Sequence, residues 1–191
     1  MRISGGSMRG RKVPSKRAGV RPTKERVREA LFSSISSRLP GAVFLDLFAG
    51  SGVVGLEALS RGVSEVVWVD VGRGQTRDLE GWLSSASSGE VAAETRVICR
   101  DVFEYLAGYR GAGVDIIFAD PPYDRDGTED WFPRLVTLIS DREVLTPGGI
   151  LIMEVAGGEQ LEPSEGWQLL REKQYGDTGL WVFERLRNVN E

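Results

Sequence analysis

An acid, two prolines and a tyrosine stand together at residues 120–123, directly after the apolar run IIFA. Asp120 is followed by Pro121, Pro122 and Tyr123. Consecutive prolines fix the backbone and supply no N–H donors, which leaves the carbonyl of Pro121 as an outward acceptor. The carboxylate and this carbonyl can accept hydrogen bonds from an exocyclic amino group, while Tyr123 stacks on the planar ring that carries it. The segment therefore predicts chemistry on the amino group of a nucleobase.

Such an amino group is a poor nucleophile because its lone pair is delocalised into the ring. Two acceptors draw the nitrogen toward tetrahedral geometry and stabilise the positive charge that develops on it. Alignment with a methyl donor supplies much of the remaining rate by proximity. The chain contains no histidine, which excludes imidazole bases and Ser-His or Cys-His nucleophiles. The predicted transfer needs neither these groups nor a metal, and we predict no metal site.

A second motif, LDLFAGSGVVG, occupies residues 45–55. Gly50, Gly52 and Gly55 fit the pattern G-x-G-x-x-G, which alone does not distinguish a dinucleotide from S-adenosylmethionine. Asp46 precedes these glycines, and a pyrophosphate would place two negative charges close to its carboxylate. S-adenosylmethionine carries an ammonium and a sulfonium instead. The acid therefore favours S-adenosylmethionine as the cofactor.

Two further acids follow predicted strands. Asp70 lies 20 residues after Gly50 and ends the second strand, where a carboxylate accepts ribose hydroxyls. Asp101 follows the third strand and has two readings that can coexist: an acceptor for the adenine amino group, or the N-cap of the next helix. Phe48, in the glycine turn, and Val102 complete the candidate cofactor contacts.

Apolar strand-like runs alternate with amphipathic stretches through most of the chain. The runs occupy 43–48, 66–70, 95–99, 114–119 and 149–155, and helices are predicted near 52–61, 75–87, 101–109 and 129–142. This alternation predicts an α/β fold with a parallel sheet covered on both faces. Residues 167–174 and 180–186 predict a hairpin that places an antiparallel strand at the sheet's edge. Ligands bind such sheets beyond the carboxyl ends of the strands.

The N-terminal part is strongly basic. Residues 1–38 carry eight arginines and three lysines against two glutamates, whereas the whole chain has a net charge of −4. We predict a loose β-hairpin and a flexible basic loop within 1–22, then a helix over 24–38. Residues 1–40 would form an RNA-contacting extension of a catalytic domain at 41–191. The candidate phosphate contacts are Arg9, Arg11, Lys12, Lys16, Arg17 and Arg21.

The sequence indicates no chemical role for several other residues. Trp68 and Phe103 are expected in the core. Cys99, the only cysteine, ends a strand expected to be buried and has no basic partner to activate it as a nucleophile. Glu154 stands after LIM on the fifth strand and faces either the ligand edge or a helix. Because no apolar run approaches the ~20 residues that span a bilayer, we expect a cytoplasmic, monomeric protein without membrane contact.

The two motifs together resemble the class I amino-methyltransferases, in which [D/N]-P-P-[F/Y] follows the fourth strand. More narrowly, MRISGGSMRGRKV, RPTKERVREALF, LDLFAGSGVVGLEALSRG, FADPPY and YGDTGLWVFER resemble segments of the RsmD family along nearly the whole chain. The resemblance implies a Rossmann-like, seven-stranded, mostly parallel sheet with an antiparallel C-terminal hairpin. It also implies methyl transfer to the N2 of a guanine in 16S ribosomal RNA, at position 966, within a small subunit or an assembly intermediate. The family's cofactor residues map to Asp46, Gly50, Gly52, Asp70 and Asp101, and its catalytic residues to Asp120 through Tyr123.

Three alternatives remain open from the residues themselves. A DNA adenine-N6 or protein glutamine methyltransferase would share the chemistry, although such enzymes usually carry an added recognition domain. A nicotinamide oxidoreductase would use the glycine motif, but Asp46 and the D-P-P-Y segment argue against it. A non-catalytic RNA-binding assembly factor would keep the pocket without turnover.

Overall fold

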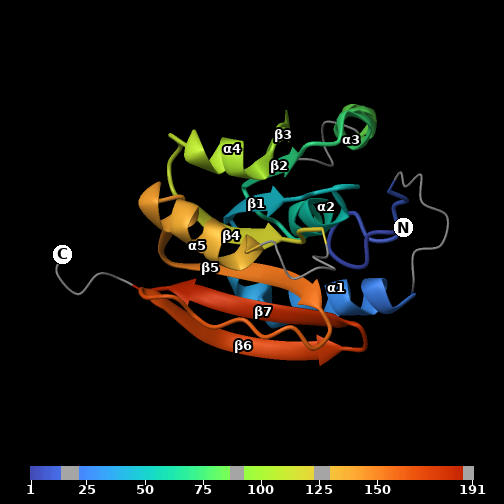
Figure 1. The fold of residues 1–191 in the computed structure, drawn as a ribbon. Helices are drawn as coiled ribbons and strands as arrows, with labels where there is room; N and C mark the ends of the chain where they lie inside the picture. The colour runs from blue at the N-terminus through green and yellow to red at the C-terminus, as the bar shows by residue number, and fades with distance from the viewer. Residues whose placement is uncertain (14–21, 87–92, 123–129, 187–191) are drawn as a thin grey trace.

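The computed structural model describes residues 1–13, 22–86, 93–122 and 130–186. Seven strands form one sheet in the order β3-β2-β1-β4-β5-β7-β6 (Figure 1). The strands are β1 Val43–Leu47, β2 Glu65–Asp70, β3 Glu94–Cys99, β4 Val114–Ala119, β5 Leu145–Ala156, β6 Trp167–Tyr175 and β7 Thr178–Arg185. Strands β1 to β5 are parallel, and β7 is antiparallel to both β5 and β6. The predicted seven-stranded, mostly parallel sheet is confirmed.

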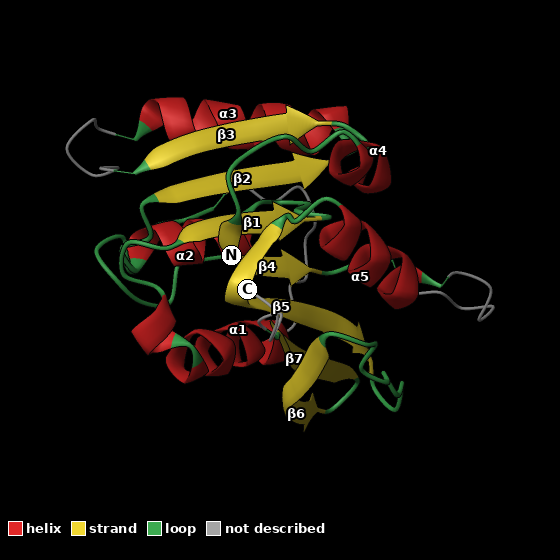
Figure 2. Ribbon diagram, turned by 90° about the vertical axis from the view of Figure 1, so that its left-hand side faces the viewer, coloured by secondary structure: helices red, strands yellow, loops and turns green. Residues whose placement is uncertain are grey.

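Helices cover both faces of the sheet (Figure 2). They are α1 Pro22–Ser34, α2 Val53–Ser60, α3 Arg73–Ser85, α4 Val102–Ala107 and α5 Trp131–Asp141, with a short 3-10 helix, η1, at Ser36–Arg38. Alternate strand residues point to opposite faces, so Phe44 packs with α1, α2 and α3, whereas Leu45 packs with α4 and α5. None of these described helices has the length and apolar character needed to cross a membrane.

The predicted C-terminal hairpin is formed by β6 and β7, and the structure shows which of the two joins the sheet. Strand β7 lies between β5 and β6 rather than at the margin, so the hairpin's first strand, β6, forms the edge. The reason is pairing: Ile150 of β5 is aligned with Glu184, and Gln168 of β6 is aligned with the same Glu184 from the other side. A hairpin pattern specifies two paired strands but not which of them joins the sheet.

Two expectations needed correction. Helix α3 begins at Arg73, not near residue 75, because Gly72 stands at its N-cap position and donates its N–H to Asp70 at 2.7 Å. Cys99 was expected in a buried strand, yet its side chain is exposed because β3 is the sheet's other edge. Trp68 and Phe103 are buried as predicted, at 1% and 8% exposure.

The described part of the N-terminal extension docks onto the helical layer of α2 and α3. Arg2 and Lys12 form an antiparallel bridge, and the buried side chains of Ile3 and Met8 join the same core as α1 and α2. Gly6 has a φ of +76°, and a Cβ there would lie 1.8 Å from the carbonyl oxygen of Ser60. Only glycine permits this close approach.

Candidate active site

The turn between β1 and α2 is held by Asp46. Its carboxylate is 1% exposed and accepts a hydrogen bond of 2.8 Å from the N–H of Gly55. Burial raises the pKa of Asp46 well above its ordinary value; the Gly55 N–H opposes this rise, and the charges of Asp120 and Asp70 add to it. Because it is turned inward to the helix start, the Asp46 carboxylate shapes the turn. Its direct contact with a cofactor stays a prediction.

Glycine is required at the centre of this turn. Gly50 and Gly52 have φ values of +53° and +73°, in the left-handed region that disfavours other residues. A Cβ on Gly52 would also lie 2.6 Å from Cδ2 of Leu79 in α3. Glycine at position 52 therefore lets the turn pack against α3, whereas the space beside Gly50 is open to a ligand.

Asp70 joins this turn to the next loop. One carboxylate oxygen accepts the N–H of Gly50 at 2.7 Å, and the other accepts the N–H of Gly72 at the same distance. The side chain is half-buried at the carboxyl end of β2. Each oxygen keeps a second lone pair, so the position predicted for ribose hydroxyls is compatible with both hydrogen bonds.

Asp101 is the N-cap of α4. Its Oδ1 accepts the N–H groups of Phe103 and Glu104 at 2.9 and 3.0 Å, so the capping reading is observed. The adenine contact proposed for the same exposed side chain stays a prediction. Val102, the other candidate in this loop, is buried at 2% exposure.

An aromatic cluster lies beside these loops. Phe48 has a φ of +57°, and its ring meets Phe103 and Trp131 edge-on, at 6.1 and 5.7 Å between centroids. Phe103 and Trp131 stack at 5.5 Å, and the Arg134 guanidinium lies 3.8 Å above the Phe103 ring centroid. Sequence reasoning placed Phe48 near the cofactor but missed Trp131 and Arg134.

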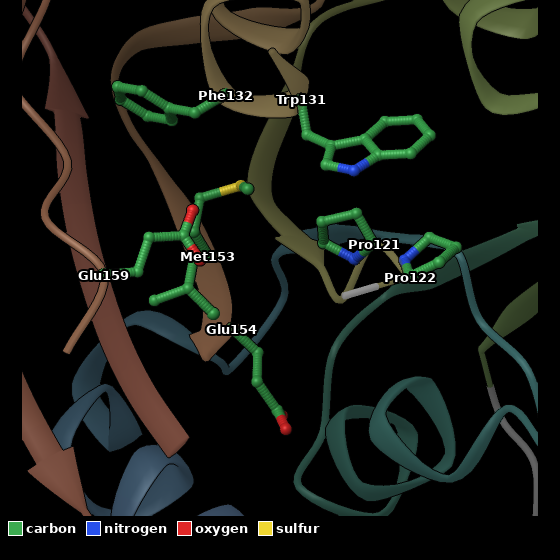
Figure 3. Close-up of a pocket in the computed structure, with 8 residues that line it drawn as sticks. Pro121, Pro122, Trp131, Phe132, Met153, Glu154 and Glu159 are labelled. Carbon is green, nitrogen blue, oxygen red and sulfur yellow. The ribbon is translucent and has the colours of Figure 1, made fainter. Parts of the chain in front are cut away.

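The D-P-P segment closes β4 in the middle of the carboxyl edge. The N–H of Asp120 lies 3.5 Å from the carbonyl oxygen of Leu47 at the end of β1. Asp120 is half-buried, Pro121 is buried and Pro122 is exposed. A pocket opens beside the two prolines (Figure 3). Its wall is formed by Pro121, Pro122, Trp131, Phe132, Met153, Glu154, Val155 and Glu159. The position of Glu154, which the sequence left open, is thus at the ligand edge.

The structure does not bring every predicted site residue into this group. Tyr123, Lys16, Arg17 and Arg21 lie outside the described residues. Arg9 and Lys12 are exposed on the N-terminal extension, whereas Arg11 is half-buried with its guanidinium 4.6 Å above the Trp82 ring. The indole N–H of Trp82 also donates to the carbonyl of Lys12 at 2.8 Å. The extension is therefore fastened to α3.

The residues at the carboxyl edge fit S-adenosylmethionine better than a dinucleotide. Asp46, Asp70 and Asp120 lie close enough for the charges of the latter two to raise the pKa of the first. A cluster of carboxylates repels a pyrophosphate and attracts a sulfonium and an ammonium. The glycine turn leaves open space beside Gly50, whose N–H donates to Asp70.

Comparisons with known proteins agree with this geometry. The family model described as conserved hypothetical protein 95 matches residues 1–184. The ribosomal RNA small subunit methyltransferase D of Escherichia coli strain K12 is 34% identical over 188 residues, covering 97% of this chain and 90% of that protein. The protein of the same name from Haemophilus influenzae is 32% identical over 186 residues, covering 96% and 93%. The solved structure of yhhF from Escherichia coli superposes with a TM-score of 0.83 at 31% identity, covering 98% of this chain and 99% of that one. The chain therefore belongs to this family, the RsmD family, and is an S-adenosylmethionine-dependent methyltransferase.

Proposed function

We propose that the protein methylates the exocyclic N2 of a guanine in small-subunit ribosomal RNA, the guanine at position 966 of 16S rRNA. The observation that carries the proposal is the place of Asp120 and Pro121 at the central strand end, next to the glycine turn. Relatives named as small-subunit rRNA methyltransferases support the choice of RNA.

The chain's own residues would act by holding the amino group. The Asp120 carboxylate and the Pro121 carbonyl would accept hydrogen bonds from the two N2 hydrogens, which localises the nitrogen's lone pair and stabilises its developing positive charge. When bound, S-adenosylmethionine would supply the methyl group and leave as S-adenosylhomocysteine, and one N2 proton would be lost to solvent. Tyr123 is proposed to stack on the guanine after the base leaves its own stack. The carboxylate cluster stabilises a positively charged reaction centre before any bond changes.

The basic N-terminal extension is proposed to position the RNA. Arg9 and Lys12 are exposed on a segment that is fixed to α2 and α3, so their charges are presented from a rigid base. Such contacts to phosphates orient a nucleic acid without reading its sequence. Residues 1–40 would thus serve as the RNA-contacting part and residues 41–191 as the catalytic part, in a monomer.

Transfer of a labelled methyl group from S-adenosylmethionine tests the proposal. Purified protein is offered small ribosomal subunits, naked 16S rRNA, DNA and total protein, and the modified nucleoside is identified by mass spectrometry. We expect N2-methylguanine in the small-subunit samples, and its loss with Asp120→Ala. Label in adenine or glutamine, or no label in any acceptor, would contradict the proposed substrate.

A further inference from the structure

We propose that Glu154 selects the target base, by accepting a hydrogen bond from the N1–H of guanine while Asp120 holds the neighbouring N2 amino group. This inference rests on the proposed function, because it names the side chain that distinguishes guanine from other amine-bearing bases at the same site.

The register of the sheet places the two acids side by side. Ala119 of β4 is aligned with Met153 of the parallel strand β5, and the next residue on each strand is an acid. Neighbouring strands lie about 4.8 Å apart. The backbones of Asp120 and Glu154 are therefore separated by about one strand spacing at the carboxyl edge.

The alternation of side chains along the two strands predicts that both acids leave the sheet on the same face. Phe118 and Ile152 pack in the core on the side of α1 and α2, whereas Ala119 and Met153 pack on the side of α4 and α5. Alternation along a strand then returns the following residue to the face of α1 and α2. Glu154 therefore projects to the face of α1 and α2, and Asp120, one residue past the end of β4, is expected to project to the same face.

Figure 3 shows where the Glu154 side chain lies relative to the aromatic residues of the pocket. The Glu154 side chain leaves β5 on the side opposite Phe132 and Trp131, and its carboxylate extends past the aromatic part of the pocket. Glu154 also lines the pocket together with Pro121 and Pro122, and its side chain is half-buried. The aromatic residues of the pocket thus lie on one side of β5, together with Glu159, and the Glu154 carboxylate lies on the other.

Guanine matches this pair of acids by its donors. Its N1–H and N2 hydrogens are adjacent and point in nearly the same direction, so two neighbouring acceptors can receive them together. Adenine and 2,6-diaminopurine carry a lone pair at N1 in place of the hydrogen. A carboxylate facing that lone pair has no hydrogen bond and is repelled, and sites built around a hydrogen bond reject analogues that lack the partner. We therefore expect the site to select guanine through the hydrogen bond from its N1–H to the Glu154 carboxylate.

2,6-Diaminopurine carries the same 2-amino group as guanine but has no N1–H, so it tests the proposed contact with Glu154 separately from the contacts with the amino group. The substrate is the RNA or small subunit that the parent protein methylates, prepared with guanine or with 2,6-diaminopurine at the target position. Binding is measured with S-adenosylhomocysteine present, and kcat/KM is measured with S-adenosylmethionine. We expect the parent to prefer guanine by at least about tenfold in both measurements.

The variant Glu154→Gln can donate its amide N–H to the N1 lone pair, so we expect it to reduce or reverse this preference. Glu172→Gln changes an exposed acid on the edge strand β6, outside the pocket, and should keep the parental ratio. The ratio compares two substrates on one preparation, so a fraction of unfolded variant does not alter it. Thermal unfolding of each variant with and without S-adenosylhomocysteine checks that the cofactor site is intact.

An unchanged guanine to diaminopurine ratio in Glu154→Gln would overturn the inference, whether kcat/KM for both substrates stays at the parental value or falls equally. If S-adenosylmethionine binding weakened while the ratio stayed unchanged, the acid would be assigned to the cofactor's ammonium instead. Failure of the proposed function looks different, because the parent itself would then methylate neither substrate.

Discussion

The carboxylate of Asp46 lies 2.8 Å from the backbone nitrogen of Gly55, and this hydrogen bond joins the end of β1 to the first turn of α2. The bond is fully buried and connects residues on either side of the glycine turn. A negative charge on this buried carboxylate is energetically costly. Asp46 therefore contributes to the site through this hydrogen bond, which shapes the backbone of the turn.

Replacement of Asp46 by asparagine should change how stability depends on pH. Burial raises the pKa of Asp46 in the folded protein, so its contribution to stability is fully present below the unfolded carboxyl's pKa of about 3.9 and is lost as the pH rises through the raised value. Asp46→Asn keeps an acceptor for Gly55 and removes the titration. We expect the variant to gain free energy of unfolding relative to the parent as the pH rises.

Urea unfolding at a series of pH values measures this difference. The comparison variant Asp46→Leu also removes the titration but loses the acceptor, so its free energy of unfolding should lie about 1–3 kcal/mol below that of Asp46→Asn at every pH. Parallel stability curves for the parent and Asp46→Asn would show that the carboxyl is not titrating in the folded protein as described.

Gly52→Ala should weaken S-adenosylmethionine binding. The left-handed backbone at this position costs a non-glycine residue about 1 kcal/mol, and the added Cβ meets Leu79 at 2.6 Å. Gly62→Ala is the matched control, since Gly62 also has a positive φ, of +91°, with open space around its Cβ. Calorimetry should show a lower affinity for Gly52→Ala alone, although both variants lose stability. Equal affinity in the two variants would mean that the turn tolerates displacement.

Glu57 anchors the N-terminal extension, and its removal should release that segment. The buried carboxylate accepts hydrogen bonds from Ser4 and Gly5 and pairs with Arg28 and Arg61. Burial alone would raise the pKa of Glu57, but the Ser4 hydrogen bonds and the two arginines hold it below its ordinary value. Glu57→Ala leaves buried Arg28 without this partner, and we expect a loss of about 3–5 kcal/mol in the free energy of unfolding.

Trypsin should cleave within residues 1–13 faster in Glu57→Ala than in the parent. Glu65→Ala removes the acid that pairs with the largely exposed Arg96, and such a surface pair contributes about 0–1 kcal/mol. If the two variants were equally stable and equally resistant to trypsin, the buried cluster would not be the anchor.

Neutralising Arg9 and Lys12 should weaken RNA binding and flatten its salt dependence. Each lost phosphate contact reduces the slope of log K against log salt by roughly 0.7–0.9, so the double variant to glutamine should lose about one to two units. Arg11 is left unchanged because its guanidinium packs on Trp82. Arg110 and Arg142, exposed at the amino ends of β4 and β5, give a charge-matched control. If the two double variants gave identical slopes of log K against log salt, Arg9 and Lys12 would not contact the RNA phosphates.

Asp120→Asn should lower turnover far more than cofactor binding. The amide keeps one acceptor oxygen but loses the charge that stabilises the developing cation, a change worth on the order of 10²-fold in kcat. The dissociation constant for S-adenosylmethionine, measured by calorimetry, should change little. Asp141→Asn, on the last residue of α5, controls for loss of charge. A parental kcat in Asp120→Asn would end the assigned role.

Much of the fold was predictable because each core strand is a short apolar run that ends in an acid or in a turn. Asp46, Asp70 and Asp120 could be placed at one edge from that pattern alone, since parallel strands share a carboxyl edge. The N-cap role of Asp101 was one of two readings, and local spacing to Phe103 was enough to suggest it.

The rest depended on contacts between distant segments. The register of β4 and β5 places Glu154 beside Asp120, and neither strand's sequence specifies that alignment. Trp131 follows the D-P-P segment in the chain, but only the packing of α5 brings its ring onto Phe103. The sequence did not specify the order of β6 and β7, and the burial expected for Cys99 was wrong, because both depend on which strands become sheet edges.

The position of β7 has a consequence for how the chain folds as it leaves the ribosome. Residues 178–185 are synthesised after every other strand, yet they fill an interior place between β5 and β6. Until they emerge, β5 presents unpaired backbone groups along one side, and β6 has no neighbour to join. The nascent sheet therefore closes late, and during that interval a free strand from another polypeptide can occupy the vacant place, so we expect shortened products to aggregate.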